Sequence, residues 1–291
     1  MDILKCAGCS KCSSAQKNKR KELFKSGFDL KKIILVGNPN VGKSVLFGAL
    51  TGVYAEVSNY PGTTVSVTKA RVDYAEIIDT PGTYSLGNFS EDERVTKEII
   101  RDADVVVNIV SATSLERDLF LTAQLIDLKI PVVVIVNQLD EAHAGGIDID
   151  FNKLEEELDC RVFSTIATKK QGIAEVIDYL RDGNFKISNK TTPTVQKMFE
   201  GKEFPVKDRI EELLRVECAH LNTRECEILH NERINFVNAT IRKSVIFNAP
   251  KKRFINSIEH FLFNPVTGFI TTIFVLYLLF EIVGVYISGS V

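Results

Sequence analysis

The sequence has no excess of positive charge and no apolar leader. Its 291 residues carry 36 Lys and Arg against 38 Asp and Glu, a formal net charge of -2. A nucleic-acid-binding surface needs basic residues to neutralise phosphates, so this composition argues against a nucleic-acid partner. The N-terminal residues MDILKCAGCSKCSSAQKNKRKELFK are polar and basic and lack the apolar core of a secretory signal. We therefore expect the bulk of the chain to lie in the cytoplasm.

The C-terminal end lacks basic residues altogether. Between Val266 and Val291 there is no Lys or Arg, and Glu281 is the one acid. The apolar stretch Ile270–Ile287, counted from Val266, is long enough to cross a bilayer core of about 30 Å as a helix. Lys251-Lys252-Arg253 precedes it and predicts a cytoplasmic N-terminal side. We expect residues 251–291 to form a juxtamembrane segment and a transmembrane helix in the lipid bilayer of the cell (inner) membrane.

Two features of this segment leave alternatives open. A buried core helix would give a similar apolar stretch. Glu281 lies well inside the apolar run, where a charged group is costly and usually faces protein or water. It either lines an ion path beside further helices or is an acid held neutral or near an interface.

The stretch from Lys31 to about Lys186 alternates between β-branched runs and helical patterns. This alternation predicts an α/β domain, 31–187, with a doubly wound, mostly parallel sheet and helices on both faces. It follows a polar, Cys-containing segment, 1–30. The predicted strands are Ile33–Val36, Ser66–Val72, Tyr74–Asp79, Val105–Val110, Val132–Val136 and Arg161–Ser164. The predicted helices are Ser44–Leu50, Glu91–Arg101, Leu115–Leu128, Phe151–Leu158 and Ile173–Leu180.

A polar linker, Ser188–Pro193, separates this domain from a region with no β-runs between Lys207 and Val245. Apolar residues recur there at helical spacing and form one stripe on each of two predicted helices. The sequence thus predicts a small all-α subdomain over 195–248. The stripe residues are Ile210, Leu213 and Leu214 in the first helix and Ile234, Val237, Ile241 and Val245 in the second.

One string matches the phosphate-binding pattern G-x-x-x-x-G-K-[ST] in full and stands between a predicted strand and a predicted helix. Its glycines let successive backbone N–H groups point at a phosphate, and the following helix N-terminus adds partial positive charge. Lys43 is expected to reach the β- and γ-phosphates, and the Ser44 hydroxyl to bind Mg²⁺. The residues of this P-loop are Gly37, Asn38, Pro39, Asn40, Val41, Gly42, Lys43 and Ser44.

Two further loops suit the same nucleotide. Asp79 follows a predicted strand, where an acid holds Mg²⁺ through a water, and the Gly82 N–H is placed to sense the γ-phosphate. The string N-Y-P-G-T-T-V, 59–65, lies where a Ras-like G domain has its first switch, and Thr64 is the better candidate for a Mg²⁺-binding threonine, with Thr63 second. The nucleotide-binding residues predicted in these loops are Gly62, Thr63, Thr64, Asp79, Thr80, Pro81 and Gly82.

The string N-Q-L-D, 137–140, resembles the N-K-x-D loop of GTPases. The resemblance assigns Asp140 to the N1 and N2 donors of guanine, a donor pair that adenine lacks. Gln138 replaces the usual Lys, which removes some stacking on the base but leaves the selective carboxylate. The loop I-A-T-K, 166–169, resembles the S-A-K loop, whose backbone N–H contacts the guanine oxygen. The predicted base-binding residues are Asn137, Gln138, Asp140, Ala167 and Thr168, and the predicted ligands are GTP and GDP.

Ras-like domains place a Gln directly after D-x-x-G, where it orients the attacking water. This chain has Thr83 at that position, so GTP hydrolysis would need a different catalytic group. Asn40 matches the asparagine with which potassium-activated GTPases hold K⁺ beside the phosphates. We expect slow GTP hydrolysis that is faster in K⁺ than in Na⁺; the alternative is that Asn40 only stabilises its loop. The predicted catalytic residues are Asn40, Lys43, Thr64 and Gly82, with Ser44, Thr64 and Asp79 for Mg²⁺.

Three cysteines, Cys6, Cys9 and Cys12, have the C-x-x-C-x-x-C spacing by which thiolates share a metal or an iron–sulfur cluster. A fourth ligand is not evident nearby. A soft-metal site and a reduced tail without metal both remain open for this segment. The scattered Cys160, Cys218 and Cys226 are most simply reduced thiols in cores or helices.

The strings G-N-P-N-V-G-K-S, N-Y-P-G-T-T-V, D-T-P-G-T-Y-S-L and N-Q-L-D, with N-P-V-T-G-F before a membrane span, resemble the ferrous iron transport protein B (FeoB) family. The resemblance covers about 31–291. It implies a GTP-hydrolysing switch, a helical subdomain at 207–245 that slows GDP release, and a membrane part that conducts Fe²⁺. It also implies a small accessory iron-transport protein and a homo-oligomer as partners. The family has many spans, so a chain with one span resembles a truncated or split transporter.

Two other functions remain open from the sequence alone. One is a membrane-tethered regulatory GTPase unrelated to iron, such as a member of the ribosome-assembly or RNA-modification class. That class expects a basic domain after the G domain, and the acidic helix 208–217 does not supply one. The other is a sensor that gates a partner by binding GTP without hydrolysing it.

Overall fold

The computed structural model describes residues 30–52, 55–87, 90–200, 208–209, 211–213, 224–248 and 261–282. Within them the strands form a seven-stranded sheet, in the order β2-β3-β4-β1-β5-β6-β8, and a two-stranded sheet, β7-β9. The strands are β1 Lys31–Gly37, β2 Glu56–Asn59, β3 Ser66–Arg71, β4 Ala75–Asp79, β5 Val105–Ser111, β6 Val132–Asn137, β7 Ile147–Ile149, β8 Arg161–Ser164 and β9 Val245–Phe247. The helices are α2 Lys43–Thr51, α3 Glu91–Ile100, α4 Leu115–Asp127, α5 Leu139–Ala144, α6 Phe151–Leu158, the 3₁₀ turn η1 Ala167–Lys169, α7 Ile173–Asp182, α8 Pro193–Phe199, α10 Arg224–Ser244 and α12 Pro265–Leu279.

The centre of the large sheet is parallel. Strand β1 pairs in parallel with β4 and β5, and the series continues through β6 to β8, while β2 and β3 add an antiparallel edge. Every residue of β5 and β6 is buried, as expected of β-branched runs covered on both faces. The predicted doubly wound, mostly parallel sheet is confirmed, and the six predicted strands are all present in it.

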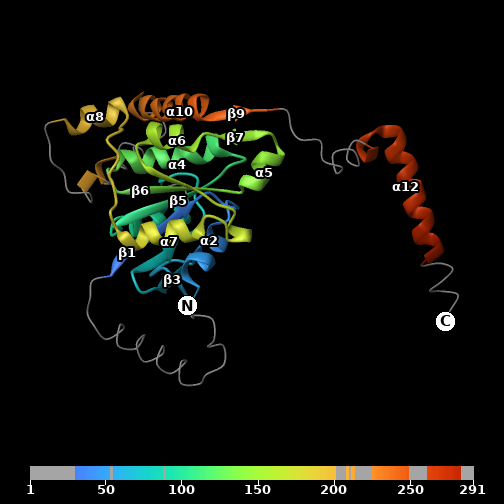
Figure 1. Ribbon diagram of the computed structural model, residues 1–291, viewed down its shortest axis with the longest axis horizontal. Coiled ribbons are helices and arrows are strands. Elements are labelled where there is room, and N and C mark those ends of the chain that lie inside the picture. Colours follow the sequence, from blue (N-terminus) through green and yellow to red (C-terminus); the bar gives the residue numbers. More distant parts are fainter. Residues whose placement is uncertain are drawn as a thin grey trace, which may run out of the picture.

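Helices cover both faces of this sheet (Figure 1). Apolar side chains of α2 and α7 form one core with the sheet, and those of α3, α4 and α6 form the other. Helix α10 adds a further layer, because its Val237 and Ile241 belong to the same core as α4 and α6. The loops that follow β1, β4, β6 and β8 therefore meet at the carboxyl edge of the sheet, where ligands of open α/β sheets bind.

The helical region ends differently from the prediction. Val245 does not continue the helical stripe: α10 ends at Ser244, and Val245 begins β9, which pairs antiparallel with β7. Ile234 is 37% exposed, so Val237 and Ile241 are the buried members of the stripe predicted on α10, and Leu229, which the prediction omits, is buried with them. From the earlier predicted helix Leu213 is buried, while Ile210 and Leu214 lie outside the described residues. The expected all-α subdomain thus contributes a strand to the G domain. A three-residue strand is too short to show the period of two that marks strands in a sequence.

Other elements were missed for similar reasons. Strand β2 is exposed along its whole length and so carries no apolar pattern. Helix α5 has six residues, of which only Ala142 is buried. Helix α8 begins with Pro193, the last residue of the predicted linker; proline is well suited to a first helical position.

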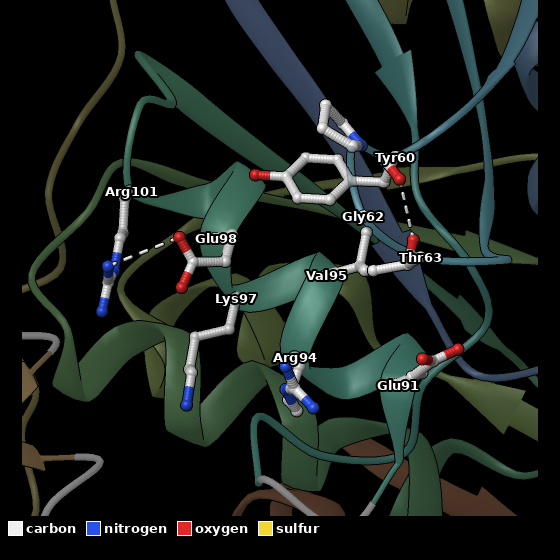
Figure 2. Close-up of a pocket in the computed structure, with 10 residues that line it drawn as sticks. Tyr60, Gly62, Thr63, Glu91, Arg94, Val95, Lys97, Glu98 and Arg101 are labelled. Carbon is white, nitrogen blue, oxygen red and sulfur yellow. Dashed lines mark hydrogen bonds and ion pairs between the residues drawn. The ribbon is translucent and has the colours of Figure 1, made fainter.

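The loop after β2 folds into a tight turn over α3 (Figure 2). The Tyr60 N–H donates to the Val65 carbonyl at 2.8 Å, and both the N–H and the hydroxyl of Thr63 donate to the Tyr60 carbonyl at 3.0 Å. A cavity of about 450 Å³ separates this turn from α3. Its lining is mostly charged on the helix side, from Glu91 and Arg94 to Arg101.

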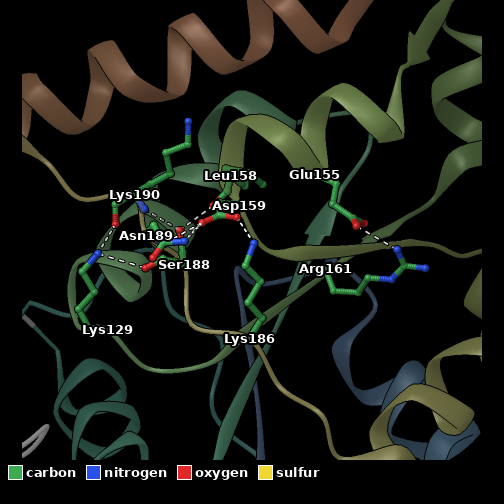
Figure 3. A network of polar contacts seen from close by, with 9 residues as sticks. All are labelled: Lys129, Glu155, Leu158, Asp159, Arg161, Lys186, Ser188, Asn189 and Lys190. Carbon is green, nitrogen blue, oxygen red and sulfur yellow. Dashed lines mark hydrogen bonds and ion pairs between the residues drawn. The ribbon is translucent and has the colours of Figure 1, made fainter.

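A polar network fastens the segment after α7 to the turn between α6 and β8 (Figure 3). Asp159 accepts from the Lys186 ammonium and from the backbone N–H of Asn189 at 2.7 Å. These hydrogen bonds, that of Lys186 first, hold the pKa of Asp159 below its ordinary value. The carbonyls of Ser188 and Lys190, in the same segment after α7, accept from the ammonium of Lys129. Contacts with Lys129 and Asp159 of the α/β domain therefore hold in place the segment that leads to α8.

Two of the scattered cysteines lie in the described part of the chain. Cys160 is buried, and burial raises the pKa of its thiol to about 12, so the thiol stays protonated at neutral pH. Cys226 lies on α10 and is partly exposed. Cys218 and the cluster of Cys6, Cys9 and Cys12 lie outside the described residues, and both interpretations of that cluster stay open.

Helix α12 is apolar and exposed. Its N-cap Asn264 accepts from the Val266 N–H at 3.0 Å, and Pro265 takes the first position. In the described ranges, Pro265–Ile282 is the one helix long and apolar enough to cross a membrane, with a mean hydropathy of 1.8 and no buried residue. Near its end, the Tyr277 hydroxyl donates to Glu281 at 3.1 Å. The predicted apolar helix is present; a membrane-spanning role stays a prediction.

A buried ion pair joins α10 to α4. Arg233 Nε lies 2.8 Å from Asp127 Oδ2, and the two side chains are 3% and 1% exposed. Asp127 also accepts from the N–H of Thr192 at 2.9 Å and from its hydroxyl at 3.2 Å. The pair thus joins the G domain, the linker and the helical region at one carboxylate.

We expect Arg233→Met to lower the free energy of unfolding by about 3–5 kcal/mol, because it leaves the buried Asp127 charge without its cation. Lys153→Met, which removes one partner of an exposed pair with Asp150, is the control and should change it by less than about 1 kcal/mol. Urea unfolding followed by circular dichroism measures both, since the chain has no Trp. Equal effects of the two variants would contradict the structural role of the buried pair.

Candidate functional site

The P-loop joins β1 to α2 and is shaped by two left-handed residues. Gly42 has φ of 89° and an added Cβ would collide with the Asn137 side chain, so only glycine fits. Asn40 has φ of 68°, a conformation that Asn tolerates better than most residues. The Asn40 side chain is exposed, whereas Asn38 is buried.

Three predicted phosphate and Mg²⁺ residues lie together in this structure. Lys43 Nζ is 2.6 Å from Asp79 Oδ1 and also donates to the Thr80 carbonyl. The Ser44 hydroxyl donates to Asp79 Oδ2 at 3.1 Å. Both side chains of the Lys43–Asp79 pair are less than one tenth exposed. A cation, a hydroxyl and a carboxylate thus converge at the start of α2, a donor set of hard oxygens beside an ammonium that suits a Mg²⁺-bound phosphate.

The D-T-P-G loop lies against the P-loop. The Thr80 hydroxyl donates to the Leu35 carbonyl at 2.9 Å, and the Thr83 N–H donates to the Gly37 carbonyl at 3.1 Å. A Cβ on Gly82 would lie 3.1 Å from atoms of Pro39. Thr83 is 2% exposed and donates its hydroxyl to the Ser85 carbonyl. Its side chain is therefore directed inward.

Thr64 is hydrogen-bonded to α3 in this structure, and its predicted role as a Mg²⁺ ligand stays a prediction. Its hydroxyl donates to Glu91 Oε2, at the N-terminus of α3, at 3.1 Å. Thr63 lies in the turn over α3 (Figure 2), and Thr64 follows it and contacts the start of that helix. Their hydroxyls are bonded to Tyr60 and Glu91 rather than to Ser44 or Asp79. Gly62, in the same turn, has φ of 77° and open space around it.

Asn137 connects three loops of the site. Its buried amide donates to the Val41 carbonyl at 2.9 Å and accepts at Oδ1 from the Ala167 N–H at 2.9 Å and the Thr165 hydroxyl at 3.2 Å. Gln138, next along the chain, has φ of 64° and donates to the Asn40 carbonyl at 3.4 Å. The P-loop, the 137–140 loop and η1 are thereby held in one arrangement.

Asp140 is paired within the site. Its Oδ2 lies 2.7 Å from the ammonium of Lys169, the last residue of η1. The hydrogen bond from Lys169 lowers the pKa of Asp140 below its ordinary value. The carboxylate is therefore ionised at neutral pH. Thr168 lies in the same turn, between Ala167 and Lys169.

Sequence reasoning missed Asp118. This residue is 1% exposed on α4, and it accepts from the Asn38 amide at 2.6 Å and from the Ser111 N–H at 2.8 Å. It thereby fixes the P-loop to the turn between β5 and α4. The signal that points to such a role is an acid at helical spacing from the apolar residues Leu115 and Leu121, on the buried side of α4. Glu91 and Lys169, the partners of Thr64 and Asp140, were missed as well, because an exposed charge gives no pattern in a sequence.

The fold and these loops define a Ras-like P-loop G domain. A family model for ferrous iron transport protein B matches residues 31–180. The chain belongs to that family, which confirms the resemblance seen in the sequence.

Relatives and solved structures agree with this assignment. The Fe(2+) transporter FeoB of Campylobacter jejuni is 30% identical over 257 residues, which are 86% of this chain and 38% of that protein. The chain therefore spans about two fifths of that relative's length. The cytosolic domain of L. pneumophila FeoB is 31% identical with a TM-score of 0.64, covering 74% of this chain and all of that one. A GDP-bound variant of the S. thermophilus FeoB G domain is 27% identical with a TM-score of 0.61, covering 75% and 100%.

We expect Asn137→Ala to lower the free energy of unfolding by about 1–3 kcal/mol, because it leaves the Val41 carbonyl and the Ala167 N–H without partners in a buried place. Guanine-nucleotide affinity should fall as well, since the three loops lose their common link. Exposed Asn152→Ala, the control, should stay within about 0.5 kcal/mol of the parent. Urea unfolding and displacement of a fluorescent GDP measure the two effects; an unchanged Asn137→Ala would contradict the linking role.

Proposed function

We propose that this chain is the GTP-binding and GTP-hydrolysing cytoplasmic switch of a ferrous-iron membrane transporter. The observation that carries the proposal is the convergence of Lys43, Ser44 and Asp79 at the carboxyl edge of the sheet. Through Asn137 this cluster is linked to the loop that carries Asp140. One nucleotide therefore has its phosphates gripped at one end and its base read at the other. Family membership supports the link to Fe²⁺.

The predicted residues divide in this proposal between the phosphates, Mg²⁺ and the base. The P-loop backbone from Gly37 to Ser44 binds the phosphates. Lys43 leaves its ion pair with Asp79 and pairs with the phosphates instead. Ser44, Asp79 and Thr64 would hold Mg²⁺, which would offset the phosphate charge; Thr64 would first have to release Glu91. The Gly82 N–H senses the γ-phosphate, next to Thr80 and Pro81. Asp140 reads guanine, with Gln138, Ala167 and Thr168 around the base.

The membrane part of the proposal rests on α12 and the basic residues before it. Lys251–Arg253 would keep the G domain on the cytoplasmic side of the cell (inner) membrane, in contact with the lipid bilayer. The helical region 195–248 would slow GDP release through its contacts with α4. A homo-oligomer and a small accessory protein are further partners of this proposal, drawn from the resemblance.

We expect Asp140→Asn to change the base preference of the site from guanine toward xanthine. The amide keeps the shape of the side chain but can no longer accept from both guanine donors, whereas it can donate to the 2-oxo group of xanthine. Affinity for GDP should fall roughly 10- to 100-fold, as for loss of hydrogen bonds to a charged group, and xanthosine diphosphate should gain. Displacement of a fluorescent nucleotide from the full chain measures both. An unchanged preference would refute base reading by Asp140.

We expect GTP turnover to be faster in K⁺ than in Na⁺, and Asn40→Ala to remove the difference. The exposed Asn40 side chain has a carbonyl oxygen, a hard ligand able to hold a monovalent cation beside the phosphates, where its charge would stabilise the transition state. Phosphate release in KCl and NaCl of equal ionic strength measures this. Equal rates for the parent chain would leave Asn40 as a loop residue only, and no turnover in either salt would favour a non-catalytic sensor.

A further inference from the structure

The base-reading carboxylate already has an N–H donor from the chain itself. Lys169 presents its ammonium to Asp140 Oδ2 at 2.7 Å, across two loops separated by 29 residues. In the described part of the chain, Lys169 is the cation paired with Asp140. The neighbouring Gln138, in the position where the GTPase loop has a lysine, is neutral and donates to the Asn40 carbonyl instead.

The backbone beneath Lys169 is fixed, so only its side chain is free to change partner. The Lys169 N–H donates to the Ile166 carbonyl at 2.9 Å, and the Ala167 N–H is held by Asn137. The side chains of Lys169 and Asp140 are 55% and 34% exposed. An exposed ion pair of this kind is weak, and a rotation of the lysine stem into solvent breaks it.

We propose that Lys169 is a specificity-determining residue that occupies, in the nucleotide-free site, the carboxylate oxygen that the second guanine N–H takes. This inference rests on the proposed reading of guanine by Asp140. A base with two adjacent N–H donors uses both oxygens of Asp140, so its second N–H competes with the Lys169 ammonium for Oδ2. A base with one donor, hypoxanthine, binds at the other oxygen and leaves the ion pair in place. The guanine 2-amino group therefore adds to the binding free energy only the difference between its own hydrogen bond to Asp140 and the contact of the Lys169 ammonium that it replaces.

The test compares GDP with inosine diphosphate on the full chain, its Lys169→Met variant and its Lys170→Met variant. Met keeps the length and the apolar stem of lysine and removes the donor. Lys170 is the adjacent lysine, in a left-handed position directly after η1, and is the matched control. Displacement of a fluorescent nucleotide gives both affinities, and circular dichroism verifies that the variants fold.

We expect Lys169→Met to bind GDP about two- to five-fold more tightly, the range expected for loss of an exposed ion pair, with inosine diphosphate unchanged. The GDP-to-inosine-diphosphate affinity ratio thus rises, while Lys170→Met leaves it unchanged. Added salt should raise the ratio of the parent chain, because it screens the exposed pair, and should not raise that of Lys169→Met. Phosphate contacts are common to both nucleotides and cancel in the ratio.

A ratio that stays the same or falls in Lys169→Met would overturn the inference. Asp140→Asn separates this failure from failure of the proposed function. If Asp140→Asn abolishes the preference for GDP over inosine diphosphate while Lys169→Met leaves the ratio unchanged, Asp140 reads the base and Lys169 has no part in specificity. If Asp140→Asn also leaves the preference unchanged, the proposed base reading itself is wrong.

Discussion

The buried amide of Asn137 is the contact on which the arrangement of the site depends. It stands at the end of β6 and reaches the P-loop carbonyl of Val41 on one side and the η1 N–H of Ala167 on the other. An amide suits this place because it can donate and accept at once; an acid could only accept and an apolar side chain could do neither. The close fit also explains Gly42, since a side chain there would occupy the space of the Asn137 amide. The relative position of these loops thus depends on the side chain of Asn137 and on the space that Gly42 leaves for it.

Around this fixed centre, the groups with the chemistry to bind a nucleotide are paired with one another. Lys43 pairs with Asp79, Asp140 with Lys169, and Thr64 donates to Glu91. None of these polar groups carries the penalty of a buried group without a partner. Ligand binding at such a site is an exchange of partners, so its free energy is a difference between two sets of polar contacts. Small changes in one partner then alter affinity and selectivity without altering the fold.

The sequence predicted the buried elements closely because burial leaves a pattern. Strand β8 and helix α6 have the predicted bounds, and the other predicted strands and helices differ by a few residues at most. Exposed or very short elements such as β2 and β9 carry no such pattern, and they were missed. The P-loop was predictable because its glycines and lysine are fixed by phosphate chemistry at a set spacing. The Asp140–Lys169 contact was not, because it depends on how two loops approach each other in space.

Helix α4 links the helical region to the P-loop. Near its C-terminal end, Asp127 is paired with Arg233 of α10; near its N-terminal end, Asp118 accepts from the P-loop amide of Asn38. Both carboxylates are 1% exposed. They are nine residues apart, which corresponds to about 13 Å along a helix. A rigid helix with a buried polar contact at each end cannot shift at one end without straining the other, because a buried charge that loses its partners is strongly destabilising. The helical region is thus part of the same polar framework that shapes the phosphate-binding loop, even though it supplies no residue to that loop.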